Sequence, residues 1–195
     1  MHAFDFLQSY GPTALVLAAH TPCGQAFAEQ LAKGGFDLLL THPDGTDLSA
    51  LKARLEDHEG VVVSTLCASE AAGGFSERVF ALSGSERVGL MVCGVGAGTA
   101  VKPGSLITSL TRVFMPNMKA RDKTGLILLD FSGKAQTFTA TLSRELLTVD
   151  TDMLRVDISN HESSTQQIAG QLAVESIASL GDAPLLEITR IATVH

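Results

Sequence analysis

The histidines are the side chains of this sequence best suited to bind a metal, but their spacing does not favour it. The chain has six histidines among 195 residues. His20, His42, His58 and His161 lie in segments separated by predicted strands, and none belongs to an H-x-x-x-H pair that would put two ligands on one helix face. We interpret them as surface or turn histidines and expect no metal site.

A cysteine and a glycine-rich turn form a second group that could do chemistry. Cys93 ends an apolar run and precedes the turn Gly94–Gly98. The thiol could be reactive, but a buried cysteine at the end of a strand is the interpretation we favour. The N–H groups of the turn, which lies before a predicted helix, could hold the anion of a nucleotide or of coenzyme A. Glu145, Asp150 and Asp152 are interpreted as solvated charges.

Composition narrows the classes of function. The net charge is −7 and the sequence pI about 5.3, and an acidic surface without a basic cluster argues against a nucleic-acid partner. No apolar run reaches the roughly 18 residues of a membrane span, and the N-terminal segment lacks the basic start of a signal peptide. Three cysteines without metal-type pairing fit a reducing compartment. We therefore expect a cytoplasmic protein with no membrane partner.

The elements that must position these residues begin with a β-α-β unit at Thr13–His42. An apolar run, a tight turn, a helical pattern, a Gly-Gly stop and a second apolar run follow one another there. Further apolar runs alternate with helical patterns, which predicts a parallel sheet with helices on both faces. The segment before Thr13 is interpreted as a lead-in. The predicted strands are 14–19, 36–41, 61–63, 88–93, 126–131, 153–158 and 185–194.

This order predicts a single α/β domain over residues 1–195, with a doubly wound parallel sheet of about seven strands in three α/β/α layers. Several fragments resemble the short-chain dehydrogenase/reductase (SDR) family. They are Thr13–Thr41, Val88–Gly96, Met115–Gly133, Ser143–Ser159 and Ile188–Val194. The resemblance implies a Rossmann-like SDR fold, whose active members are NAD(P)-dependent oxidoreductases.

The resemblance also identifies what the cofactor turn lacks. The three glycines of the family motif T-G-x-x-x-G-x-G fall on Ala18, Pro22 and Gly24. A Cβ at Ala18 crowds the turn, and Pro22 puts a ring without an N–H donor where a cofactor phosphate should lie. Gly24, which packs the helix against the strand, is kept. Asp44 follows the second strand and is interpreted as a turn aspartate rather than a ribose ligand. We expect no cofactor in this chain.

Most of the catalytic residues that the resemblance leads us to seek are absent. The family relays a proton through Asn, Ser, Tyr and Lys. The serine position is kept at Ser132, but the stretch between it and Ser143 is too short for the Y-x-x-x-K segment. The single tyrosine, Tyr10, precedes the first strand, and residues 159–164 are too few for the family's substrate loop. We interpret Ser132 as a remnant and expect no catalytic residue.

The segments that the family uses for subunit contacts are kept. The resemblance assigns these contacts to predicted helices at 105–121 and 136–147, and to the last helix and strand at 165–180 and 185–194. The leading hypothesis is a non-catalytic SDR-fold subunit that assembles with an active, NAD-carrying SDR paralogue in a hetero-oligomeric alcohol dehydrogenase. The alternatives are a divergent NAD(P)-dependent oxidoreductase active on its own and a nucleotide- or CoA-binding module.

Overall fold

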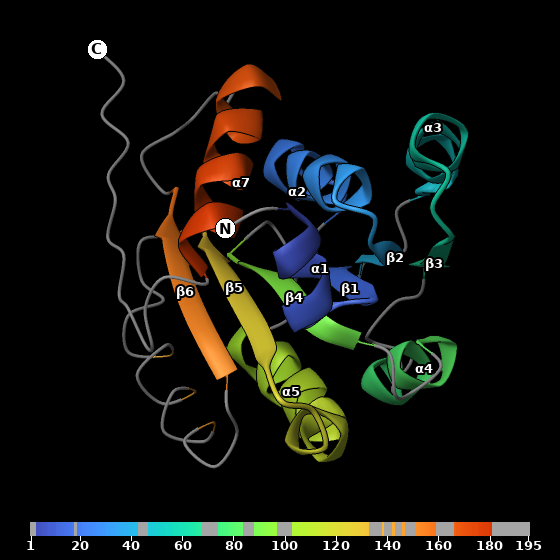
Figure 1. Cartoon of the computed structure of the whole chain (residues 1–195). Helices are drawn as coiled ribbons and strands as arrows, with labels where there is room; N and C mark the ends of the chain where they lie inside the picture. Colours follow the sequence, from blue (N-terminus) through green and yellow to red (C-terminus); the bar gives the residue numbers. More distant parts are fainter. Residues whose placement is uncertain are drawn as a thin grey trace.

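The fold is built on a parallel sheet of six strands. The computed structural model describes residues 3–17, 19–42, 47–67, 74–83, 88–96, 103–132, 138, 142, 146, 151–158 and 166–180. All strand pairs are parallel, and their order across the sheet is β3-β2-β1-β4-β5-β6 (Figure 1). The strands are β1 Thr13–Leu17, β2 Asp37–His42, β3 Val63–Cys67, β4 Val88–Val95, β5 Thr124–Asp130 and β6 Thr151–Asp157.

The central strands are buried on both faces. In β1, Ala14 and Val16 belong to the hydrophobic cluster on one side of the sheet, whereas Leu15 and Leu17 belong to the cluster on the other side. A strand covered on both faces needs apolar side chains at every position rather than at alternate ones. That requirement explains why uninterrupted apolar runs in the sequence identified the central strands.

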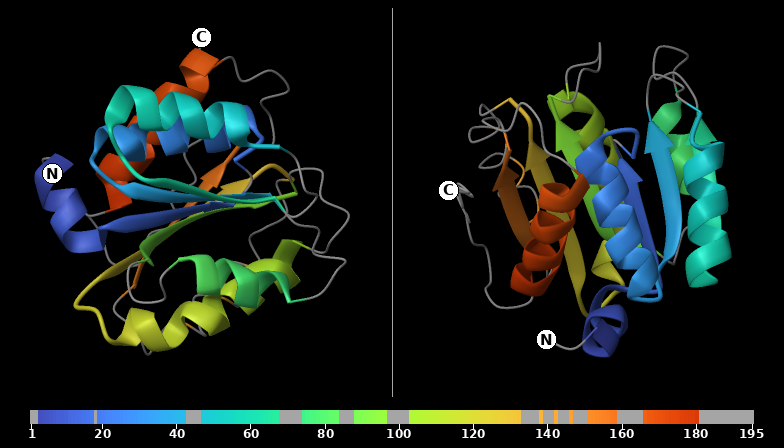
Figure 2. Two further views of the ribbon diagram at one scale, coloured as in Figure 1. Left: turned by 90° about the vertical axis from the view of Figure 1, so that its right-hand side faces the viewer. Right: turned by 90° about the horizontal axis from the view of Figure 1, so that it is seen from above.

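Helices cover both faces and complete three layers (Figure 2). One face carries α2 Pro22–Lys33, α3 Ser49–Glu59 and α7 Gln166–Leu180, and the other carries α4 Phe75–Leu82 and α5 Pro103–Lys119. This arrangement confirms the predicted Rossmann-like three-layer α/β/α fold. Among the described residues, no helix combines the length and the apolar character needed to cross a membrane.

The predicted strand count and the bounds of the third strand need correction, whereas the predicted helix 136–147 is supported where it is described. The described residues form six strands rather than about seven, and the predicted strand 185–194 lies outside them. The third strand was placed at 61–63, but β3 runs over Val63–Cys67 because its register with β2 begins where Leu38 pairs with Val63. Of the predicted helix 136–147, only Phe138, Leu142 and Leu146 are described. All three are helical, and the two leucines are buried.

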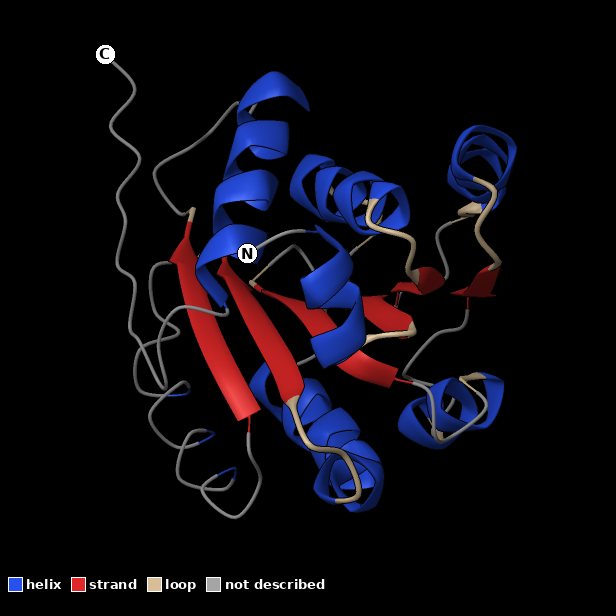
Figure 3. Ribbon diagram, in the orientation of Figure 1, coloured by secondary structure: helices blue, strands red, loops and turns tan. Residues whose placement is uncertain are grey.

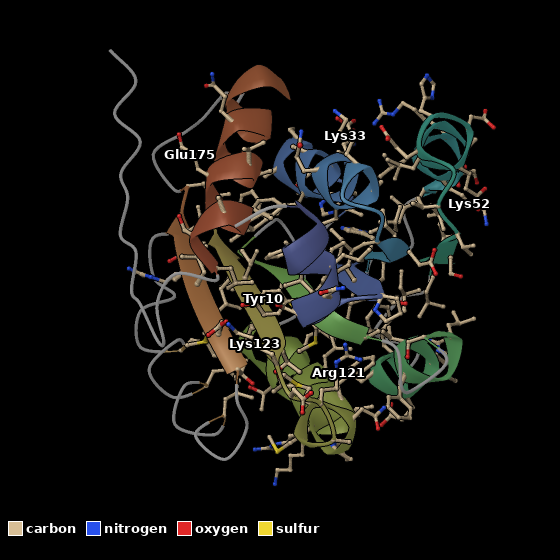
Figure 4. The ribbon with its side chains drawn as sticks, viewed as in Figure 1. Tyr10, Lys33, Lys52, Arg121, Lys123 and Glu175 are labelled. Atoms are coloured by element: carbon tan, nitrogen blue, oxygen red, sulfur yellow. The ribbon has the colours of Figure 1, made fainter. Side chains whose placement is uncertain are left out.

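The segment interpreted as a lead-in is in part a helix, α1 Ala3–Tyr10, which contacts β4 and β5 at the amino end of the sheet. The phenol of Tyr10, fully buried, donates a hydrogen bond to the Asp152 carboxylate, which also lies 2.9 Å from the Lys123 ammonium (Figure 4). Asp152 is therefore not the solvated charge that was expected. Asp152 lies near the start of β6, where it contacts Tyr10 of α1, a residue far away in sequence.

Candidate functional site

The candidate site lies at the carboxyl edge of the sheet, where β1, β2, β4 and β5 end (Figure 3). Chain order reverses between β1 and β4, which are adjacent in the sheet. In open parallel sheets ligands bind at such a reversal, because the loops on either side diverge and leave a crevice. The residues that follow these four strands decide what the crevice can bind.

The first turn of α2 offers few backbone donors to an anion. Thr21 is the N-cap, and its Oγ1 accepts a hydrogen bond of 3.0 Å from the Gly24 N–H. The Gln25 N–H donates to the Thr21 carbonyl at 2.9 Å, and Pro22 at N1 has no N–H. A helix start binds phosphate through N–H groups that point at the ligand. Here Thr21 itself accepts from Gly24 and Gln25. Ala18 lies outside the described residues.

Two histidines meet beside this turn. The Nε2 atoms of His20 and His42 are 3.1 Å apart, and the ring centroids are 3.5 Å apart. His42 is the last residue of β2 and is 2 % exposed, and His20 is half-buried. His42 is therefore a buried strand residue rather than the expected surface or turn histidine, whereas His20 lies in a turn as expected. His20 follows β1 and His42 ends β2. These two strands are adjacent and parallel, so their carboxyl ends bring the two residues together.

The glycine-rich segment after Cys93 is less open than predicted. Strand β4 continues to Val95, and Gly94 and Val95 pair with Leu129 and Asp130 of β5. The turn therefore begins at Gly96 rather than at Gly94, because the sheet register extends two residues further. Residues 97–98 lie outside the described part. Two of the three described residues of the predicted anion turn thus belong to β4 and pair with β5.

Gly96 lies just after β4, where the backbone comes close to Ser132, just after β5. Its φ of +82° favours glycine, and a Cβ at this position would lie 2.8 Å from the Ser132 Cβ. The Phe131 N–H donates to the Val95 carbonyl at 2.9 Å, so the ends of the two strands are tied together. The approach is too close for a side chain, which leaves Ser132 packed against backbone.

Ser132, the residue at the family's serine position, forms local hydrogen bonds. Its hydroxyl donates to Asp130 Oδ1 at 2.9 Å, and its N–H donates to the same oxygen at 3.0 Å. The other oxygen of the buried Asp130 carboxylate lies 3.4 Å from Nη1 of Arg155, which is also buried. A serine and an aspartate two residues apart commonly stabilise a turn in this way. The arrangement holds the end of β5 in place.

The Cys93 thiol is unsuited to nucleophilic chemistry. The residue is fully buried in β4, and burial raises its pKa to about 12. The thiolate is the reactive form, so this thiol stays protonated at neutral pH. The expectation of a buried strand cysteine is confirmed.

The remaining predicted site residues lie mostly outside the described part of the chain. Asp44 and residues 159–164 lie outside the described part of the chain. Within the described part, no group of three or more His, Cys, Asp or Glu side chains comes together in a way that could hold a metal. Sequence reasoning missed the His20–His42 pair and the Asp130–Arg155 ion pair. A search for polar residues at the ends of neighbouring predicted strands would have found the first.

The fold of the chain resembles that of solved dehydrogenases. A short-chain dehydrogenase from Sphingobium yanoikuyae in complex with NADPH superposes with a TM-score of 0.66 at 20% identity, covering 86% of this chain and 84% of the other. A metagenomic short-chain oxidoreductase in complex with NADP gives 0.66 at 17% identity, with 96% of each chain covered. A 7β-hydroxysteroid dehydrogenase gives 0.66 at 17%, covering 87% and 85%.

These similarities show that the chain has the Rossmann-like fold of the short-chain dehydrogenases. No protein-family model matches the sequence, and no curated protein matches it. The comparisons therefore show the fold alone. Any function must be argued from the residues at the carboxyl edge of the sheet.

Proposed function

We propose that this chain is a non-catalytic subunit with the SDR fold, which assembles with an active SDR paralogue into an NAD-dependent alcohol dehydrogenase. In this proposal the paralogue carries the NAD and the catalytic residues, and this chain carries neither. Its role is to complete the assembly.

The start of α2 carries the argument. Pyrophosphate binding needs N–H groups free to point at the ligand and a backbone without a ring in the way. Pro22 supplies no N–H, and the Gly24 N–H donates to the side chain of its own N-cap. The His20 and His42 rings also lie at the ends of β1 and β2, where the ribose acid of a Rossmann site would be expected.

The environment of Ser132 supports the same conclusion. A serine in a proton relay must direct its hydroxyl at the substrate or at the tyrosine. Here the hydroxyl donates to Asp130 Oδ1, whose carboxylate also faces Arg155. The single tyrosine, Tyr10, is buried at the opposite end of the sheet, bonded to Asp152.

The helix α5 is a suitable surface for a partner. It has no acidic residue over Pro103–Lys119, although the whole chain has a net charge of −7. Its outward side carries Ser109, Arg112 and Pro116. Depletion of charge is typical of interface cores, and arginine is enriched there. The predicted contacts through 136–147 and through the last helix and strand, 165–180 and 185–194, belong to the same proposal.

The particular assembly that we propose is 2-[hydroxy(phenyl)methyl]succinyl-CoA dehydrogenase of anaerobic toluene degradation. That enzyme is similar to the assembly proposed above, because it joins an inactive, shortened SDR subunit to an active one. In that case the oxidised substrate is the alcohol of a CoA thioester, and the oxidation belongs to a β-oxidation sequence.

Co-purification tests the proposal. We expect the chain, co-expressed with a full-length SDR encoded beside its gene, to elute as one complex with NAD-dependent alcohol dehydrogenase activity. Calorimetric titration of the isolated chain with NAD+ and NADP+ should give no heat of binding. A chain that stays monomeric beside every such partner, or that binds NAD+ alone, would overturn the proposal.

The second candidate is a divergent NAD(P)-dependent oxidoreductase active on its own. The fold favours it, since two of the similar structures are complexes with NADPH or NADP. It predicts saturable cofactor binding and turnover by the isolated chain. A nucleotide- or CoA-binding module is a third candidate, but two of the five residues of its proposed anion turn, Gly94 and Val95, lie in β4. Coenzyme A should raise the melting temperature of the isolated chain only in that third case.

A further inference from the structure

Strand β3 lies at one edge of the sheet, next to α3. The strand order ends at β3, and within the described part of the chain β3 pairs with β2 alone (Figure 1). An edge strand presents N–H and C=O groups that can pair with a strand of another molecule. We propose that Lys52 and Glu56 of α3 occupy this edge and keep a second copy of this chain from pairing with it.

The register with β2 identifies the groups of β3 that face outward. Leu38 lies opposite Val63, and the Leu38 N–H donates to the Val62 carbonyl at 2.9 Å. In a parallel ladder a residue bonds to the two neighbours of the residue opposite it. Val62 and Ser64 therefore face β2, whereas Val63 points its N–H and its C=O away from β2. The same alternation makes Thr65 the next outward residue.

Both outward groups of Val63 are bonded to side chains of α3. The Lys52 ammonium donates to the Val63 carbonyl at 2.6 Å, and the Val63 N–H donates to Glu56 Oε1 at 3.2 Å. Lys52 Nζ and Glu56 Oε1 are 3.5 Å apart, a distance that residues one helical turn apart can reach. One ammonium and one carboxylate therefore take the two places that an incoming strand would need at Val63.

The packing of α3 puts these two side chains in place. Leu51 and Leu55 are the buried residues of this helix, and each is followed directly by a member of the pair. Successive helical residues are turned by about 100°, so the pair lies beside the buried face rather than opposite it. The side chains of Lys52 and Glu56 are 40 % and 35 % exposed. They reach β3 from the side from which a second molecule would approach.

A second copy of this chain is the partner that fits the edge. Two identical edges can pair antiparallel about a two-fold axis, because such an interface joins the same groups of both molecules. The strand Val63–Cys67 has no charged residue, and Val62 before it is 64 % exposed, so β3 itself does little to oppose pairing. The α3 pair opposes it, because an incoming strand would have to break two hydrogen bonds and remove water from two charges.

This contact is separate from the proposed function. The surfaces proposed for the paralogue are α5, residues 136–147, and the last helix and strand. Strands β3 and β6 lie at opposite edges of the described sheet. Association through β3 would therefore add to the assembly that the wild-type chain forms, and it can fail or succeed whether or not a paralogue binds.

Self-association of the full chain tests the proposal. By light scattering, we expect the double variant Lys52→Ala/Glu56→Ala to have twice the molar mass of wild type at the same high concentration. The matched control is Glu29→Ala/Arg54→Ala, which removes another ion pair of α3, 2.7 Å across, and should leave the mass unchanged. If circular dichroism shows that the double variant is unfolded, Lys52→Met replaces it. That variant keeps the apolar stem, loses the donor, and should also raise the mass.

Amide hydrogen exchange identifies the surface that associates. In the double variant the Thr65 N–H should exchange about ten-fold more slowly at high than at low concentration, because it bonds to the second copy, whereas wild type should show no such change. Adding Thr65→Pro removes that donor at an edge position, where proline is tolerated, and should restore the wild-type mass.

Two results would overturn the proposal. One is a folded double variant that keeps the wild-type mass at every concentration. The other is a double variant that associates while the exchange of its Thr65 amide does not slow, since association would then use another surface.

Discussion

The two ends of the parallel sheet are stabilised in different ways. At the amino end, bonds join residues far apart in sequence: Tyr10 reaches Asp152, and Arg121 Nη2 donates to the Gly11 carbonyl. At the carboxyl end, the bonds around the crevice are mostly local, as between Gly24 and Thr21. Figure 4 labels Tyr10 and Lys123 close together, and the Lys123 ammonium lies 5.4 Å from the centroid of the Tyr10 ring.

This difference shows where long-range contacts stabilise the fold and where a local cap uses a backbone donor beside the crevice. Local caps satisfy backbone donors that a nucleotide would otherwise use. The amino end, which plays no part in ligand binding in this class of sheet, carries the buried Tyr10–Asp152 hydrogen bond, which ties the first helix to β6. Substitutions at the two ends should therefore behave differently.

The largest effect is expected at the amino end from Asp152→Ala. The change removes the carboxylate that accepts from the buried Tyr10 hydroxyl, which also lies 3.5 Å from the Leu180 carbonyl, and it removes the counter-charge of the Lys123 ammonium. Breaking a buried pair by removing one partner is strongly destabilising, and here Lys123 is partly exposed, so we expect a loss of about 3 kcal/mol in the free energy of unfolding. Urea unfolding measures it.

The matched control for that variant is Asp57→Ala, since Asp57 is exposed on α3. Its free energy of unfolding should stay within about 0.5 kcal/mol of wild type. A loss below about 1 kcal/mol for Asp152→Ala would mean that the amino end is not the stabilising end, and the comparison would fail.

An intermediate effect is expected from pH acting on Cys93 in β4. Its folded pKa is raised from 9.0 to about 12 by burial. A raised pKa means that the unfolded chain loses its thiol proton first, so the stability is complete below pH 9 and falls as the pH rises toward 12. The expected slope is about 1.4 kcal/mol per pH unit.

Denaturant unfolding of wild type and Cys93→Ala between pH 8 and pH 10 would measure this slope. The other titrating groups are common to both proteins, so the difference between the two curves isolates Cys93. Parallel curves would show that the thiol ionises as easily in the folded protein as in the unfolded chain.

The smallest effect is expected at the carboxyl end from Ser132→Ala. One hydrogen bond to Asp130 is lost while the Ser132 N–H still donates to the same oxygen, so the cost is about 0.5–1 kcal/mol. In the co-purified complex the dehydrogenase activity should stay within about two-fold, because under the proposed function Ser132 takes no part in proton transfer. A loss of about 100-fold or more, the usual effect of removing an acid–base group, would identify Ser132 as catalytic instead.

Much of the fold could be predicted from local patterns. Apolar runs located β1 and β2, Pro22 marked the start of α2, and Gly34 after Lys33 marked its end. Each of these signals acts over a few residues and reflects burial or backbone geometry. The N-terminal helix was missed because its residues were treated as a lead-in, although its last residue, Tyr10, is fully buried.

The sequence by itself determined the type and order of the elements from β1 to α7, and it determined that no N–H stands at Pro22, because these properties depend on each residue and its near neighbours. The tertiary structure decided that His20 meets His42 and that Asp152 is buried under Tyr10. Those contacts depend on which strands are adjacent and in what register. Register is set by the packing of the whole sheet, which no local pattern contains.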